Sequence, residues 1–145
     1  MSRVSLTTDC WTSIQNISYM CLTVHWIDDN LKLQKRVISF VHVPCHKGEM
    51  IGKELIACLN EGGITRVFSV TVDNASSNAV ALKKVKEYLQ EKKHGIVLNG
   101  EMFHMRCCAH IVNLIVCDGL KELNESIASI RNAVRYVRSS SARLK

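Results

Sequence analysis

Two aspartates occur where extended segments of the chain could bring them together. Asp9 lies in VSLTTDCWTS, and Asp73 ends an apolar run in FSVTVDNASSNA. Carboxylates on adjacent strands supply hard oxygen ligands for Mg²⁺ or Mn²⁺, and a pair of such ions can promote phosphodiester cleavage and strand transfer. A structural alternative stays open, in which Asp73 caps the following turn or helix and Asp9 is a solvated acid at a strand end.

A Cys-x-x-His pair, Cys107 and His110, occurs in RCCAH. At the start of a helix both side chains could face the same region. They supply only two ligands for zinc and no second pair is spaced to complete a tetrahedron, so we expect no structural zinc. A cysteine nucleophile assisted by His110 would lack a third, orienting group. From the residues alone, buried packing of Cys107 and Cys108 is the simplest interpretation.

Three arginines, Arg131, Arg135 and Arg138, recur at positions i, i+4 and i+7. On a helix they form one basic stripe, which suits phosphate contacts and salt-sensitive DNA binding. A solvated face explains the same spacing equally well, because the opposite face carries the apolar residues Ile127, Ile130, Val134 and Val137.

The composition is that of an ordinary globular domain. The chain has 145 residues, of which 47% are hydrophobic and 22% charged, enough for one domain with a substantial core. Seven cysteines without a CxxC pair indicate a reducing compartment inside the cell. The formal net charge of +6 favours a polyanionic partner. We expect no membrane partner, because no apolar run reaches the length of a span and the N-terminus lacks the apolar core of a secretory signal.

Periodicity predicts the elements that would position these residues. Residues 4–9, 17–27 and 31–43 have strand character, the last two as an antiparallel hairpin, and residues 66–72 form a buried strand. Helices are predicted from Glu49 to the Gly62-Gly63 pair and after Asp73, with Ser76 or Ser77 as a cap. The strand aromatics could stack on bases, although such residues usually belong to the core; they are Trp11, Tyr19 and Trp26.

A short strand at residues 101–107 leads into a helix near Ala109, and another helical pattern follows Gly119. The predicted fold is therefore α/β, a mixed sheet of three antiparallel strands then two parallel strands, flanked by helices on both faces. If the later parallel strand pairs beside the first, Asp9 and Asp73 become neighbours. This is the layout of the ribonuclease H-like (RNase H-like) fold.

Four segments together resemble the RNase H-like catalytic core of hAT-superfamily DNA transposases: TTDCWTS, SVTVDNASSNA, RCCAHIVNLIV and IRNAVRYVRSSSARLK. The similarity is greatest to the plant ricesleeper-like, BED zinc-finger group. The resemblance implies a nuclear, DNA-binding protein whose DDE triad holds two divalent ions, Mg²⁺ or Mn²⁺, for DNA transposition. It implies that Asp9 is the first acid and Asp73 the second. It also matches Cys107 and His110 to a Cys/Asp-x-x-His motif close to the family's active site.

The chain departs from the family pattern in one respect that bears on activity. The family's glutamate follows a large helical insertion downstream of the RYVRSS segment, and no acid after His110 stands in that context; the acids there include Asp118, Glu122 and Glu125. We expect one partial RNase H-like domain over residues 1–145, without a BED finger or an insertion domain. The expected function is a fragment or domesticated relic of a transposase core, with inherited DNA and metal binding and no transposase activity alone.

Two alternatives stay open. The chain is a non-enzymatic nuclear module for DNA binding or protein interaction, or it is a transposase that acts only when another chain supplies the missing parts. The corresponding partners would be DNA and either a second copy of the chain or a full-length transposase-like protein.

Overall fold

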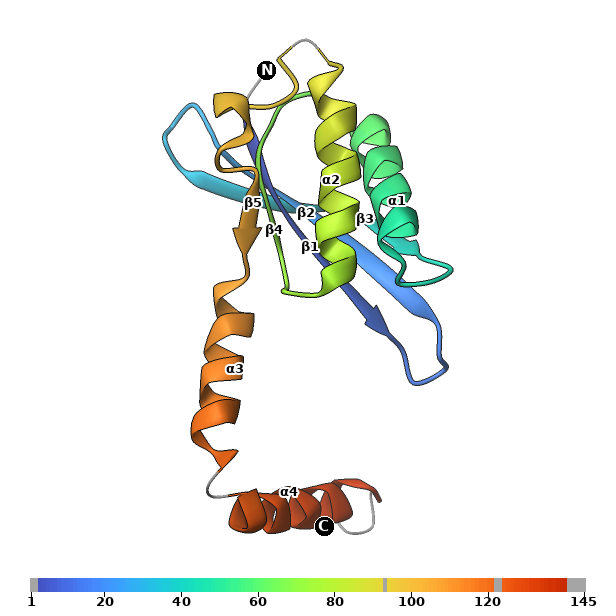
Figure 1. Cartoon of the computed structure of the whole chain (residues 1–145), viewed down its shortest axis with the longest axis vertical. Helices are drawn as coiled ribbons and strands as arrows, with labels where there is room; N and C mark the ends of the chain where they lie inside the picture. Colours follow the sequence, from blue (N-terminus) through green and yellow to red (C-terminus); the bar gives the residue numbers. More distant parts are fainter. Residues whose placement is uncertain (1–2, 93, 122–123, 141–145) are drawn as a thin grey trace. The chain divides into compact units, whose positions relative to one another are not determined.

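The computed structural model describes residues 3–92, 94–121 and 124–140. The chain divides into two compact units, Met1–Cys107 and Cys108–Lys145. Each unit is described by itself (Figure 1).

The first unit is built on a five-stranded mixed sheet. Its strands are β1 (Val4–Thr12), β2 (Ser18–Ile27), β3 (Leu33–His42), β4 (Val67–Val72) and β5 (His104–Arg106). Their order across the sheet is β3-β2-β1-β4-β5. The first three strands are antiparallel, whereas β4 is parallel to β1 and β5 is parallel to β4. This confirms the predicted mixed sheet with β1 at its centre.

The bounds of β1 and β5 differ from the sequence prediction in ways that bear on the predicted site. β1 does not stop at Asp9 but continues to Thr12, because it keeps pairing with β2 as far as Thr12 and Ser18. Asp9 therefore lies inside a strand and not at its end. β5 is shorter than predicted, since a 3-10 turn at Leu98–Gly100 precedes it.

The parallel pairing of β1 with β4 contains one irregularity near its start. Val4 is opposite Val67, but the next residue, Ser5, is opposite Ser69. Phe68 is thus an extra residue on β4, as in a β-bulge. From Ser5 onward the register is regular and reaches Thr7 opposite Thr71.

Two helices, α1 (Gly48–Glu61) and α2 (Ser76–Gln90), lie side by side against one face of the sheet (Figure 1). Both follow the predicted apolar stripes, and their inward residues form the core with the strands. The core of fully buried large side chains comprises Leu6, Met20, Leu22, Ile51, Leu55, Leu59, Leu89, Val43, Val67, Val70, Val72 and Val85. The predicted serine cap of α2 is not formed, because Ala75 occupies the N-cap position and no side chain caps it.

The first turns of α1 and α2 touch each other at Gly48. A methyl group on this buried glycine would overlap the carbonyl oxygen of Ser77 and lie 2.6 Å from Cβ of Val80. Only a residue without a side chain allows this approach, so Gly48 fixes the start of α1 against the start of α2.

The second unit consists of α3 (Cys108–Gly119) and α4 (Asn124–Arg138). These are the two helices predicted near Ala109 and after Gly119. The prediction that helices flank the sheet on both faces stays a prediction for the second face, since α3 and α4 are described apart from the sheet. No helix among the described residues combines the length and apolar character needed to cross a membrane.

Candidate functional site

The strand register brings the two predicted acids together. Thr7 of β1 is opposite Thr71 of β4. Continuing the same parallel register by two residues places Asp9 opposite Asp73. The acids are 64 positions apart in sequence, and they become neighbours because β4 is inserted into the sheet directly beside β1.

Asp73 is held at the turn between β4 and α2. Its Oδ1 accepts a hydrogen bond from the backbone N–H of Ala75 at 2.8 Å and another from the side-chain amide of Asn78 at 2.5 Å. The bond to Ala75 is the turn-capping role that the sequence left open for Asp73. It engages one carboxylate oxygen, while Oδ2 accepts no hydrogen bond from another described residue.

Asp9 and Asp73 line the same small hollow, which we call the acid hollow; its volume is about 50 Å³. It is bounded by β1, the loop before α1, and the turn into α2. Its lining residues are Thr8, Asp9, Cys10, His46, Ile51, Asp73, Ala75, Ser77 and Asn78.

The pKa of the Cys10 thiol reflects the acidic side chains of the acid hollow. Its pKa is raised from the ordinary 9.0 to about 11, first because the thiol is half-buried and then because Asp9 and Asp73 both lie near it. A thiolate here would be poorly solvated and would face two carboxylates. Cys10 is therefore a neutral thiol at physiological pH, and Asp9 and Asp73 are the acidic side chains that line the hollow beside it.

The donor set of the acid hollow fits a hard divalent ion. Two carboxylates are the ligands that Mg²⁺ and Mn²⁺ prefer. Thr8 adds a buried hydroxyl oxygen that has no hydrogen-bond partner among the described residues. Yet no group of three or more His, Cys, Asp or Glu residues in the described part of the chain is arranged to hold a metal. Asp9 and Asp73 would therefore hold an ion that keeps several water ligands.

The two residues of the Cys-x-x-His pair, Cys107 and His110, belong to different units. Cys107 follows β5 and is half-buried, and its backbone N–H donates to the carbonyl of Val72 at 2.9 Å, one residue before Asp73. The structure thus brings Cys107 to the end of the strand that carries Asp73. His110 lies in the first turns of α3, in the second unit. The catalytic roles suggested for both residues stay predictions.

Arg131, Arg135 and Arg138 lie on α4 and are exposed. Their spacing places them along one side of that helix. The DNA-binding role of this arginine stripe stays a prediction.

The strand aromatics divide into two groups. Trp26 packs against the core, as expected for a strand aromatic. Trp11, Tyr19 and Phe40 form a cluster with ring centroids 5.3–6.1 Å apart. Trp11 and Phe40 remain 38% and 59% exposed, so this cluster is a surface feature and not part of the core.

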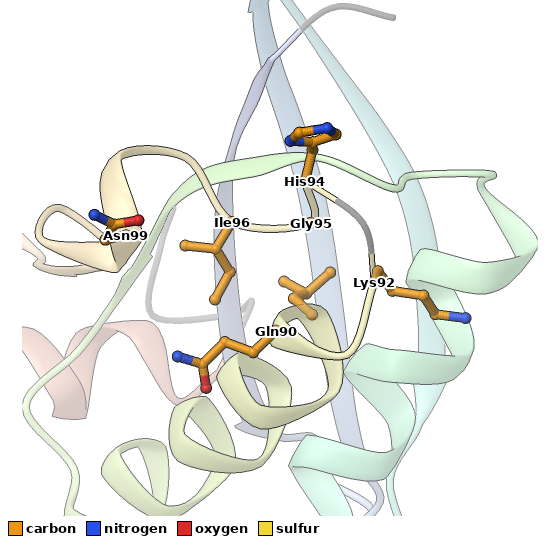
Figure 2. Close-up of a pocket in the computed structure, with 7 residues that line it drawn as sticks. Gln90, Lys92, His94, Gly95, Ile96 and Asn99 are labelled. Atoms are coloured by element: carbon orange, nitrogen blue, oxygen red, sulfur yellow. The ribbon is translucent and has the colours of Figure 1, made fainter.

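A second and larger hollow, of about 310 Å³, lies at the other end of α2 (Figure 2). The helix rises about 1.5 Å per residue, so this hollow lies roughly 20 Å along the helix from the turn at Asp73. No carboxylate lines it among the described residues. Its lining residues are Leu89, Gln90, Lys92, His94, Gly95, Ile96 and Asn99.

A mixed sheet in this strand order, with one acid in β1 and another directly after the neighbouring strand β4, is the arrangement of an RNase H-like domain. The chain matches the family model described as "ZBED1 RNase-like domain" over residues 7–102 and the "ZBED1 RNase-like helical domain" over residues 105–145. The protein therefore belongs to the hAT-type, transposase-related family.

Three relatives illustrate this membership. A Zea mays protein named "Putative AC transposase" is 43% identical over 141 residues, which cover 96% of this chain and 18% of the relative. "Zinc finger BED domain-containing protein RICESLEEPER 2" of Oryza sativa subsp. japonica is 28% identical over 97% of this chain and 20% of its own length. A Talaromyces stipitatus protein named "Putative transcriptional regulator tpeD" is 27% identical over 93% of this chain and 16% of its own length. The chain thus spans a fifth or less of these three relatives.

Asn78 and His46 line the acid hollow, but neither residue is assigned a role from the sequence. Asn78 lies within the FSVTVDNASSNA segment that carries Asp73, and His46 lies in the loop before α1. The available signal for Asn78 is its position in the first turn of a helix that follows an aspartate, where an amide can reach back to the carboxylate. No comparable signal marks His46.

Proposed function

We propose that this chain supplies the two-aspartate part of a hAT-type transposase site, and that it binds a divalent ion and DNA without cleaving DNA by itself. Asp9 and Asp73 hold Mg²⁺ or Mn²⁺. When bound, such an ion would activate a water or DNA hydroxyl and offset charge on a phosphodiester.

The observation that carries this proposal is the alignment of Asp9 with Asp73 across β1 and β4. The acids share one hollow, and both contribute to the raised pKa of Cys10. Asp73 is oriented by two donors on one oxygen, which leaves its other oxygen for a ligand. We propose no DNA cleavage by this chain alone because Asp9 and Asp73 are the two carboxylates that line the acid hollow, whereas the resemblance implies a triad of acids.

Mn²⁺ titration by calorimetry tests the metal site. We expect Asp9→Asn and Asp73→Asn each to weaken Mn²⁺ binding by at least about tenfold, since each removes a charged ligand. Asp29→Asn is the matched control, because Asp29 is an exposed acid in the turn between β2 and β3, outside the acid hollow. Equal Mn²⁺ affinity in the wild type and both site variants would refute the metal proposal.

DNA binding is proposed to use the arginine stripe of α4. Replacing Arg131, Arg135 and Arg138 with glutamine should weaken binding of a short DNA duplex. The slope of log affinity against log salt concentration should also become shallower, by the equivalent of up to about three phosphate contacts. A control with the same charge change replaces three exposed lysines of the first unit with glutamine, namely Lys35, Lys53 and Lys83. If both triple variants lose the same affinity, the effect is one of net charge and the stripe has no special role.

Catalysis is tested separately. Labelled duplex DNA incubated with the chain and Mn²⁺ should show no nicking or strand transfer above that of Asp9→Asn. Cleavage that the wild type performs and the Asp9 variant does not would show an active nuclease and overturn the inactive part of the proposal.

A non-enzymatic regulatory module is the second candidate. It is favoured by one observation, that the fungal relative is named as a transcriptional regulator. The two candidates separate on metal dependence: a regulatory module should bind DNA equally well in Mn²⁺ and in EDTA. Both candidates act in the nucleus, which follows from a role on DNA.

A further inference from the structure

The loop between β3 and α1 contributes one side chain to the acid hollow. His46 lines the hollow together with Asp9 and Asp73, although it comes from a different part of the fold. It is exposed, and it has no hydrogen-bond or ion-pair partner among the described residues. Its imidazole is therefore available to a molecule that enters the hollow.

The packing of α1 holds His46 in this position. Gly48, two residues later, is pressed against Ser77 and Val80 of α2. Ser77 itself lines the acid hollow. The loop before α1 is consequently anchored beside the turn that carries Asp73, so the presence of His46 follows from core packing and does not depend on a flexible segment closing over the site.

The geometry argues against His46 as a third metal ligand. Within the described residues, no three side chains of the His, Cys, Asp and Glu types are arranged around a common ion position. His46 lines the hollow but does not face a common ion position with the two carboxylates. It is therefore placed to contact a ligand that also binds the ion. A neutral or charged imidazole has an N–H donor for such a group.

We propose that His46 contacts the DNA phosphate at the acid hollow, with its imidazole N–H donating a hydrogen bond to a non-bridging phosphate oxygen. This deepens and rests on the proposed metal and DNA binding of the same site. The two aspartates alone would repel a phosphodiester, whereas a hydrogen-bond donor that lines the same hollow provides an attractive contact.

The test compares His46→Ala and His46→Gln with the wild type. His104→Ala is the matched control, because His104 is an exposed histidine of the same unit that does not line the hollow. The probes are Mn²⁺ alone, measured by calorimetry, and a short fluorescein-labelled DNA duplex, measured by anisotropy in Mn²⁺ and in EDTA. Circular dichroism checks that each variant is folded.

We expect His46→Ala to keep Mn²⁺ affinity within about twofold and to weaken DNA binding in Mn²⁺ about fivefold, the size of one net hydrogen bond. His46→Gln should recover part of the loss, since its amide donates from a similar position, and His104→Ala should bind DNA as the wild type does. DNA affinity that is equal in His46→Ala and His104→Ala refutes the contact. Mn²⁺ affinity that falls as far as in Asp9→Asn makes His46 a metal ligand, which also overturns the proposal.

Failure of the underlying metal site gives a different result. In that case the wild type and Asp9→Asn take up Mn²⁺ alike, or not at all. The EDTA measurement then decides the role of His46 without the ion: a loss specific to His46→Ala supports a phosphate contact, and no loss rejects it.

A measurement without DNA tests the position of His46. Mn²⁺ held by the aspartates should broaden the Cε1 proton resonance of His46 more strongly than that of His104, with the signal assigned by its disappearance in His46→Gln. Equal broadening of the two resonances would show that His46 does not border the ion site.

Discussion

Asn78 offers the sharpest test of how the acid hollow is organised. Its side-chain amide donates to Oδ1 of Asp73 at 2.5 Å, so it fixes the direction in which the carboxylate presents Oδ2. In Asn78→Ala only the backbone bond from Ala75 remains on Asp73. The carboxylate is then free to turn about its Cβ–Cγ bond.

The expected loss follows from the type of bond. A hydrogen bond to a charged group contributes about 1.5–3 kcal/mol. Asp73 and Asn78 are half-buried, so we take the lower end, and about 1.4 kcal/mol is a factor of ten in affinity. We therefore expect Asn78→Ala to weaken Mn²⁺ binding about tenfold, in the range usual for groups that orient a metal ligand.

The assay is the same Mn²⁺ calorimetry, accompanied by urea unfolding. Asn78 lies in the first turn of α2, where alanine is the better helix former, so a general loss of stability is not expected to mimic the effect. Asn74→Ala is the control, because Asn74 is exposed in the same turn and does not line the hollow. Unchanged Mn²⁺ affinity in Asn78→Ala, with Asp73→Asn still defective, would refute the orienting role of this bond.

Three further perturbations test the surrounding structure. Gly48→Ala should lower the free energy of unfolding by about 1–3 kcal/mol, because the added methyl overlaps the start of α2; a urea midpoint equal to that of the wild type would contradict the close approach. Cys10, with its pKa near 11, should carry about a hundredfold less thiolate at pH 8 than in the unfolded chain, so iodoacetamide labelling measured by peptide mass spectrometry should be slow and should accelerate in Asp9→Asn. The pKa of Asp28 is lowered, first by the backbone N–H of Lys32, and its stabilising contribution is present above the ordinary value of 3.8 and lost as pH falls through the folded-state pKa. The stability advantage of wild type over Asp28→Asn, followed by urea unfolding, should therefore shrink on acidification below about pH 4, and an advantage that is independent of pH would disprove it.

The sheet and its two acids were predictable because their signals are local or follow from chain order. The alternation of residues in the strands and the order of the elements predict that β1 is central in the sheet. They also predict that β4, which ends just before Asp73, lies beside β1. The sequence did not indicate that β1 runs on to Thr12, because TTDCWTS is polar and its extension depends on pairing with β2. Asp9 was therefore expected at a strand end and is found within the strand.

His46 could not be identified in the same way. Its place in the hollow depends on the contact of Gly48 with Ser77, which joins residues about thirty positions apart and leaves no periodic pattern. The predicted serine cap of α2 was wrong for a related reason. Serine is a common N-cap residue, but here Asp73 accepts the hydrogen bond from the backbone N–H of Ala75 in the turn before the helix. Long-range packing determines both features.

The bulge at Phe68 determines which residue Asp9 faces. If Phe68 paired regularly with Ser5 and did not bulge, Thr7 would pair with Val70 and Asp9 with Val72, and Asp73 would move opposite Cys10. Neighbouring strand positions point to opposite sides of a sheet, so a slip of one residue would separate the two carboxylates. The bulge takes Phe68 out of the register and so brings the acids into line. Flattening the bulge with Phe68 kept would separate the carboxylates, whereas deleting Phe68 would leave Ser5 opposite Ser69 and Asp9 opposite Asp73.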